Sequence, residues 1–273
     1  MKVLGLIAGS GGLPKTVALE AKAKGYKVVA VALEPICDLR LEPHVDVFKC
    51  VHIGKLGEVI KALKKQGVTE AVMAGKISKT LLYRKKVRPD LRAAKLLFML
   101  KDRGDDSIIN AVAREFEKDG IKLIGISELC SALLTPEGPL TKGPPTDAEW
   151  KDIKFGFRVA KEIGRLDIGQ TVVVKDRAVM AVEAIEGTDE AIKRGGGLAG
   201  GGATVIKVIR PSQDIRFDVP VVGMDTLHAM VKAHIRVLAL EAHKSLLLDR
   251  GGFISRAEKA GISVIGVTER SIK

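Results

Sequence analysis

The sequence predicts an α/β protein with a Rossmann-like parallel-sheet domain at its N-terminal end and a smaller mixed α/β domain after it. Over residues 2–126, buried strands alternate with amphipathic helices, which is typical of βαβ units and a parallel sheet. Residues 132–146 hold four prolines and no periodic pattern, so they interrupt this alternation. The length of 273 residues suits two ordinary domains. We therefore expect domains at 1–131 and 147–273, with 132–146 as a linker.

Local patterns place the elements of the first domain. Continuous apolar runs that end in turn residues predict buried strands, and apolar residues at helical spacing predict the helices between them. The strands are expected at 2–8, 27–33, 45–53, 68–74 and 121–126. The helices are expected at 14–25, 56–66, 91–101 and 106–119.

The second domain is expected to open with a long helix over 147–165, with Thr146 or Asp147 as its N-cap. Two glycine triplets, 195–197 and 200–202, predict a flexible loop that acts as a mobile element. The other expected elements are a hairpin of 170–174 and 178–185, a short helix at 188–194, a strand at 204–209, helices at 225–238 and 253–260, and a last strand at 262–267.

Composition restricts the classes of function. The net charge of +12 favours an anionic partner, but only 4% of residues are aromatic and no basic helix carries stacking side chains, which argues against nucleic acid. No apolar run reaches the length of a membrane span, and the N-terminal run is broken by glycines, unlike a signal peptide. Three cysteines without CxxC spacing predict reduced thiols in a cytoplasmic protein. One Asn and three Gln beside abundant Lys and Glu predict a thermophilic source.

A glycine-rich turn follows the first expected strand. Gly9, Ser10, Gly11 and Gly12 lie between that strand and a helix, where small residues let the backbone approach an anion and the helix offers free N–H groups. The turn does not complete the G-x-G-x-x-G pattern of dinucleotide-binding proteins. The sequence predicts contact with a nucleotide or a diphosphate here; the alternative is a tight turn without a ligand.

Two further features belong to the same predicted sheet. Gly75 and Lys76 follow the fourth strand, at the edge where open parallel sheets bind ligands, and Lys76 is placed to neutralise a phosphate. Glu34 ends the second strand, where a dinucleotide fold contacts a ribose. These features keep an NAD-dependent oxidoreductase as the alternative function.

Two acidic clusters lie in the second domain. One follows a strand and contains Glu183, Glu186 and Asp189, and the other is the loop between Pro211 and Pro220. Oxygen ligands from two such clusters suit a hard divalent cation, Mg²⁺ or Mn²⁺, although an ordinary solvated loop fits the spacing equally well. The loop carries Gln213, Asp214, Arg216 and Asp218.

The motifs LGLIAGSGGLP, MAGKIS, GDDSII, GQTVVVKDRAVMAVEAIEGTDEAIKR and IRPSQDIRFDVPVVG resemble those of the metal-dependent UDP-2,3-diacylglucosamine pyrophosphatases of lipid A biosynthesis. The resemblance runs over essentially the whole chain and implies cleavage of UDP-2,3-diacylglucosamine to UMP and 2,3-diacylglucosamine 1-phosphate (lipid X), with Mg²⁺ preferred. It also implies an essential aspartate in the second half, which we assign to Asp218, with Asp214 and Asp225 as competitors.

Chemistry then suggests roles for the remaining side chains. Asp214 and Asp218 are expected to bind the metal or orient water, with Glu183, Glu186 and Asp189 nearby. The expected substrate-binding residues are Gly9, Ser10, Gly11, Gly12, Gly75, Lys76, Thr188, Gln213 and Arg216. A basic protein with a lipid substrate is expected to work in the cytoplasm, peripherally at the cytoplasmic face of the inner membrane, and a homodimer is one option for its assembly.

Overall fold

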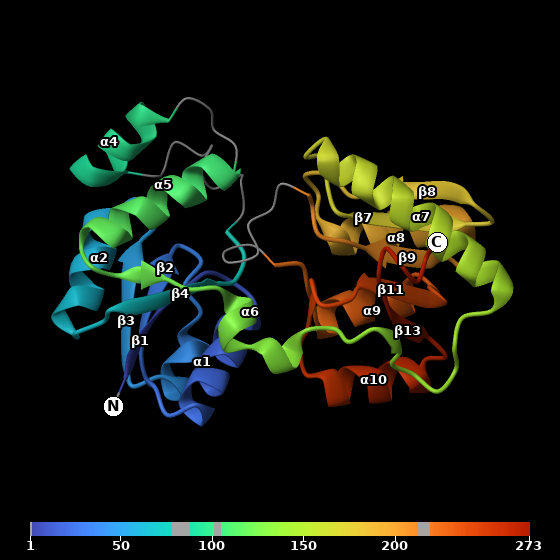
Figure 1. Cartoon of the computed structure of the whole chain (residues 1–273), viewed down its shortest axis with the longest axis horizontal. Coiled ribbons are helices and arrows are strands. Elements are labelled where there is room, and N and C mark those ends of the chain that lie inside the picture. The colour runs from blue at the N-terminus through green and yellow to red at the C-terminus, as the bar shows by residue number, and fades with distance from the viewer. Residues whose placement is uncertain (1, 78–87, 101–104, 212–218) are drawn as a thin grey trace. The chain divides into compact units, whose positions relative to one another are not determined.

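The computed structural model describes residues 2–77, 88–100, 105–211 and 219–273. These residues form two compact units, the first ending at Ser131 and the second beginning at Ala132 (Figure 1). None of the helices in the described ranges is long and apolar enough to cross a membrane.

The first unit is built around a five-stranded sheet in the order β3-β2-β1-β4-β5, and all of its strand pairs are parallel. Helices α2 and α5 share one hydrophobic core with the sheet, and α1 packs against β1, β2 and β4. The elements are β1 (Val3–Ala8), α1 (Leu13–Ala23), β2 (Lys27–Glu34), η1 (Leu39–His44), β3 (Val47–His52), α2 (Leu56–Lys65), β4 (Glu70–Ala74), α4 (Leu91–Met99), α5 (Asp105–Lys118), β5 (Lys122–Leu123) and α6 (Ile126–Leu129).

The second unit has a six-stranded mixed sheet in the order β6-β13-β11-β9-β7-β8. Strands β9, β11 and β13 are parallel to one another, and the other pairings are antiparallel. The elements are η2 (Ser131–Leu133), β6 (Gly138–Pro139), α7 (Asp147–Arg165), β7 (Thr171–Lys175), β8 (Ala178–Val182), α8 (Thr188–Ala199), β9 (Thr204–Lys207), β10 (Val221–Val222), α9 (Met224–Lys232), β11 (Val237–Glu241), β12 (Leu246–Leu247), α10 (Arg250–Lys259) and β13 (Ser263–Val267).

Helices cover both faces of this second sheet. Ile206 on β9 lies in a core with α7, whereas its neighbour Val205 lies in a core with α8, α9 and α10. This alternation follows from the two-residue period of a strand. The predicted α/β class is therefore confirmed, but the main sheet of the second unit, with six described strands against five in the first, is not the smaller one.

Several predicted boundaries hold and others do not. Thr146 is the N-cap of α7, in a capping box with Glu149. The predicted hairpin is present as β7 and β8. The strand predicted at 121–126 is shorter in the structure. Strand β5 covers only Lys122–Leu123, and helix α6 already begins at Ile126.

The segment 132–146 contributes to the second unit. Gly138 and Pro139 form the edge strand β6, which pairs with β13. Thr135 is fully buried, and its hydroxyl accepts a hydrogen bond from Ser245 Oγ at 3.1 Å. The prolines suit this edge position, because proline has no N–H for a second ladder.

The prediction of a flexible loop at the glycine triplets is wrong for the first triplet. Residues 195–197 belong to α8, and both Gly195 and Gly196 are buried. A Cβ on Gly195 would lie 2.6 Å from Val173 Cβ, and one on Gly196 would lie 2.5 Å from the carbonyl oxygen of Ala233. These glycines therefore let α8 approach the sheet and α9 closely. The helix ends where Gly200 adopts a left-handed conformation.

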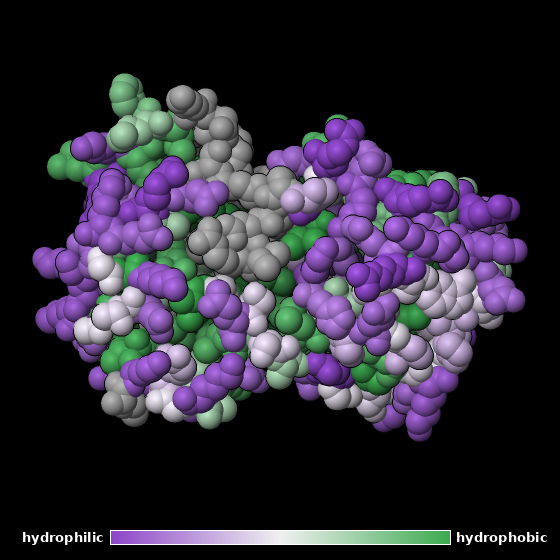
Figure 2. Space-filling model, in the orientation of Figure 1, coloured by the Kyte–Doolittle hydropathy of each residue, from purple (hydrophilic) through white to green (hydrophobic). Residues whose placement is uncertain are grey.

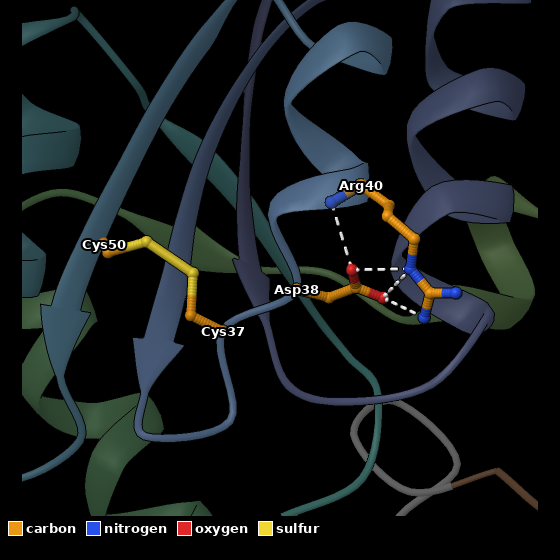
Figure 3. Close-up of a disulfide and its surroundings, with 4 residues drawn as sticks. All are labelled: Cys37, Asp38, Arg40 and Cys50. Carbon is orange, nitrogen blue, oxygen red and sulfur yellow. Dashed lines mark hydrogen bonds and ion pairs between the residues drawn. A yellow bond between two sulfur atoms is a disulfide. The ribbon is translucent and has the colours of Figure 1, made fainter.

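The prediction of three reduced thiols is also wrong, because Cys37 and Cys50 form a disulfide (Figure 3). Cys37 follows β2 and Cys50 lies in the adjacent strand β3, which brings their Cα atoms to 6.5 Å. Asp38 and Arg40 beside the bond form an ion pair, and the hydrogen bonds from Arg40 lower the pKa of Asp38. Cys130 is free and buried.

Candidate functional site

In the first unit, the turns after β1 and β4 are joined by hydrogen bonds. Ser10 N donates to Lys76 O at 3.0 Å, Lys76 N donates to Ser10 O at 2.9 Å, and Ser10 Oγ donates to Lys76 O at 3.0 Å. Gly9 N donates to Ala74 O at 2.8 Å. The structure thus brings together the two glycine-containing turns that the sequence predicts at the carboxyl edge of the sheet. Strands β2 and β3 lie on one side of β1, and β4 lies on its other side. The two turns therefore lie at the topological switch point, where open parallel sheets bind ligands.

The glycines of these turns fall into two groups. A Cβ on Gly9 would lie 2.8 Å from Lys76 O, and Gly75 has a φ of 101° and equally close neighbours, so both are required by the junction itself. Gly11 and Gly12 are exposed, and nothing lies within 4 Å of a Cβ placed on either. These two leave the first turn of α1 accessible to an anion.

In the second unit, a buried chain of hydrogen bonds joins the ends of β8 and β9. Lys207 Nζ donates to Thr188 Oγ1 at 2.6 Å, and Thr188 Oγ1 donates to Glu183 Oε1 at 2.8 Å. Lys207 is 3% exposed and Glu183 8% exposed. Burial of two opposite charges is costly unless they are paired and hydrogen-bonded, and the threonine hydroxyl connects them here.

One oxygen of Glu183 has no hydrogen-bond partner within the described part of the chain. Among the described residues, no donor satisfies Glu183 Oε2, although it is buried. An orphaned buried carboxylate oxygen in a native fold calls for an explanation such as a water or an ion. Glu183 therefore has both the burial and the free oxygen that a metal ligand needs.

The other two acidic side chains of this cluster, Glu186 and Asp189, bind other partners. Glu186 accepts from Arg194 at 2.6 Å, and hydrogen bonds from its own N–H and from Arg194 lower its pKa. Asp189 accepts from Thr226 Oγ1 at 2.8 Å. Within the ranges that the structure describes, no three His, Cys, Asp or Glu side chains are grouped to hold a metal ion.

A second buried carboxylate fixes the backbone that leads into the acidic loop. Glu241, at the end of β11, accepts from Lys161 Nζ at 2.6 Å and from the backbone N–H of Ile209 at 3.0 Å. Arg210 follows and pairs with Asp167. Glu241 therefore holds the backbone at Ile209, just after β9.

Sequence reasoning missed Lys207, Glu241, Lys161 and Arg210. A signal was present, because Lys207 and Glu241 each close an apolar strand, where a buried charge needs a partner.

Of the predicted site, Gln213, Asp214, Arg216 and Asp218 lie outside the described residues. Asp225 lies exposed in the first turn of α9, which begins at Met224 and has Gly223 as its N-cap.

Comparison with known proteins identifies the family. The model of the LpxI N-terminal domain matches residues 3–133, and that of the LpxI C-terminal domain matches residues 136–265. The curated UDP-2,3-diacylglucosamine pyrophosphatase LpxI of Caulobacter vibrioides is 35% identical over 280 aligned positions, which cover 98% of each chain. This chain belongs to the LpxI family.

Two solved structures show only a weak likeness to this chain. The biotin carboxylase domain of the Hydrogenobacter thermophilus 2-oxoglutarate carboxylase shares 15% identity, covers 72% of this chain and 41% of its own, and has a TM-score of 0.29. N5-carboxyaminoimidazole ribonucleotide synthetase of Thermotoga maritima shares 19% identity, with coverages of 67% and 41% and a TM-score of 0.23. Neither carries an argument about this chain.

Proposed function

We propose that this chain hydrolyses the diphosphate of UDP-2,3-diacylglucosamine, with UMP and 2,3-diacylglucosamine 1-phosphate as products. The observation that carries the proposal is the full-length relation to the curated LpxI enzyme, which covers both units of the chain. The match to the LpxI C-terminal domain covers residues 136–265 and so includes the acidic stretches of the second unit, where the chemistry of diphosphate cleavage requires charged groups.

The turn in the first unit supports binding of the UDP portion. Gly11 and Gly12 leave the N-terminal N–H groups of α1 open to diphosphate oxygens, and Lys76 is exposed on the adjacent turn. Oriented N–H groups and a lysine together stabilise an anion. We assign Gly9 and Gly75 to holding this turn rather than to contact with substrate.

The buried group of the second unit supports a role in catalysis. Lys207 supplies a positive charge that can stabilise the charge developing on a transferring phosphoryl group, and Thr188 and Glu183 fix its position. The unpaired oxygen of Glu183 fits a divalent cation, with Asp214 and Asp218 as further ligands. When bound, Mg²⁺ would neutralise phosphoryl oxygens.

Turnover and metal dependence are tested together. The purified protein should release UMP from UDP-2,3-diacylglucosamine, lose this activity in excess chelator and regain it with Mg²⁺. Asp218→Asn should lower kcat by about 10²-fold or more with a normal circular dichroism spectrum. Full activity in chelator would exclude the metal but not the hydrolysis. Reduction of NAD⁺ without UMP release would favour the oxidoreductase instead.

The substrate class also bears on location. A lipid-linked nucleotide is presented at a membrane surface, and the net charge of +12 favours an anionic one. We therefore propose peripheral association with the cytoplasmic face of the inner membrane. Co-sedimentation of activity with washed membranes at low salt, and its release at high salt, would test this location.

A further inference from the structure

Helix α4 of the first unit carries apolar side chains on its solvent-facing side. Leu91 is 92% exposed, Phe98 91% and Met99 70%, while Leu96 is the buried residue of the helix. Leu91, Lys95 and Phe98 follow the spacing of one helical face, and Met99 lies one turn from Lys95. Figure 2 shows hydrophobic residues at the upper left of the view, where Figure 1 places α4. We name Leu91, Phe98 and Met99 the α4 apolar face.

Polar contacts hold the opposite side of α4 against the unit. Asp90 caps the helix by accepting from Ala93 N, and it also accepts from Gly57 N at the start of α2, both at 2.8 Å. Arg92 pairs with Glu115 at 2.7 Å and with Asp119 at 2.5 Å. The helix is therefore anchored by Asp90, Arg92 and the buried Leu96, and it presents Leu91, Phe98 and Met99 outward. The exposed side of an ordinary surface helix is polar instead.

The described carboxylates that contact α4 are engaged within the unit, Asp90 with backbone N–H groups and the others with cations. The nearby carboxylates Glu115 and Asp119 are already paired with Arg92, Lys118 and Lys64. Lys95 is exposed on the same side of the helix, between Leu91 and Phe98. An apolar helix face with a basic residue is the pattern of helices that lie in the interface of an anionic bilayer. A second copy of this chain carries the same charge of +12 and is the less complementary partner.

We propose that α4 docks the protein on an anionic phospholipid surface, with Leu91, Phe98 and Met99 inserted among the acyl chains and Lys95 at the headgroups. The inference rests on the proposed function for its purpose, since a lipid-linked substrate lies in such a surface. Its physical basis is separate, because the apolar face and its charge are independent of any catalytic group.

The test uses the full-length protein and vesicles without substrate. Wild type should float with vesicles that contain phosphatidylglycerol and bind those of pure phosphatidylcholine less well. The variant Leu91→Ser/Phe98→Ser should lower the partition coefficient about tenfold or more, because two exposed apolar side chains lose their insertion. The matched control Leu39→Ser/Leu166→Ser removes leucines that are 66% and 58% exposed elsewhere and should bind as wild type does.

Hydrolysis of detergent-dispersed substrate is measured on the same proteins. The α4 variant should keep the wild-type KM and kcat there, with an unchanged melting curve. Equal vesicle binding by wild type and variant would overturn the proposal. A raised KM in detergent would show that the face contacts the acyl chains of substrate instead, and a change in sedimentation coefficient would show an interface between copies. Absence of hydrolysis with normal vesicle binding would reject only the proposed function.

Discussion

At the residue scale, the most informative side chains are charged groups that the fold buries. Lys207 closes an apolar strand, and the sequence alone gave no partner for it. The partner Thr188 lies at the start of α8, and the pairing exists only because β8 and β9 flank β7 in the sheet. Contacts between residues distant in sequence follow from strand order, which sequence patterns do not contain. The sequence predicted that Glu183 and Thr188 belong to one site. Only the strand order shows that Lys207 joins them there.

Lys207→Met should reduce kcat/KM for UDP-2,3-diacylglucosamine by about 10²-fold, because it removes a fixed positive charge from a buried position. Part of the loss should return in Lys207→Arg. The control is Lys193→Met, which removes an exposed lysine of α8 that pairs with Glu190 at 2.6 Å, and this variant should turn over normally. UMP release at the wild-type rate by both methionine variants would show that Lys207 has no part in the reaction.

Gly12→Ala tests the turn of the first unit. Gly12 has a φ of −78° and open space around a Cβ, so the variant should fold normally. If the backbone contacts the diphosphate, the added methyl should raise KM several-fold and leave kcat unchanged. Gly251→Ala, at an equally open position in α10, is the control. An unchanged KM for Gly12→Ala would assign the turn to structure alone.

At the element scale, the predicted helices and strands agree with the structure where periodicity decides. Capping residues fixed the start of α7 correctly, because a cap is a local interaction. The first glycine triplet was misjudged because close helix packing, like loop flexibility, selects glycine. Likewise, the pairing of Cys37 with Cys50 depends on the contact between β2 and β3, so cysteine spacing gave no sign of it.

Two adjacent glycines of α8 separate packing from flexibility. Gly196→Ala should lower the free energy of unfolding by about 1–3 kcal/mol, since its Cβ would meet the backbone of Ala233 at 2.5 Å. Gly197→Ala meets nothing within 4 Å and should be neutral or stabilising by up to about 1 kcal/mol. Urea denaturation measures both. Equal effects would contradict the tight packing of this helix.

The anchoring of α4 should depend on pH. Lys118 and then Arg92 lower the pKa of Glu115, and Lys64 and then Arg92 lower that of Asp119. Carboxyls whose pKa is lower in the folded state stabilise it above their unfolded pKa, and this contribution is lost as pH falls. Arg92→Gln should therefore cost about 1 kcal/mol at neutral pH, and the difference from wild type should shrink below about pH 4. A difference in melting temperature that is constant with pH would contradict this.

At the scale of the whole molecule, composition leads to expectations that no local contact supplies. With one Asn and three Gln in 273 residues, the chain is poor in thermolabile amides. We expect a melting temperature above about 65 °C, the upper end of the ordinary mesophilic range. Calorimetry on the purified protein measures it, and a transition inside that range would contradict a thermophilic source.

Family membership covers both units, whereas the predicted catalytic aspartates Asp214 and Asp218 lie outside the described residues. The α/β class followed from the sequence because strand and helix periods are local and regular. The site was harder to predict from the sequence, since its described part consists of buried charges that are paired across the sheet. The reaction of the whole protein is therefore tested more directly than the role of any one residue.

The most direct test is hydrolysis of UDP-2,3-diacylglucosamine in water labelled with the heavy oxygen isotope, followed by mass spectrometry of both products. We predict UMP without label and 2,3-diacylglucosamine 1-phosphate with one labelled phosphate oxygen. The resemblance to the UDP-2,3-diacylglucosamine pyrophosphatases implies this outcome, since in that family water attacks the phosphorus next to the sugar and UMP leaves. Label in UMP would contradict that direction of attack. Failure to form UMP, in a folded protein supplied with Mg²⁺, would contradict the proposed function itself.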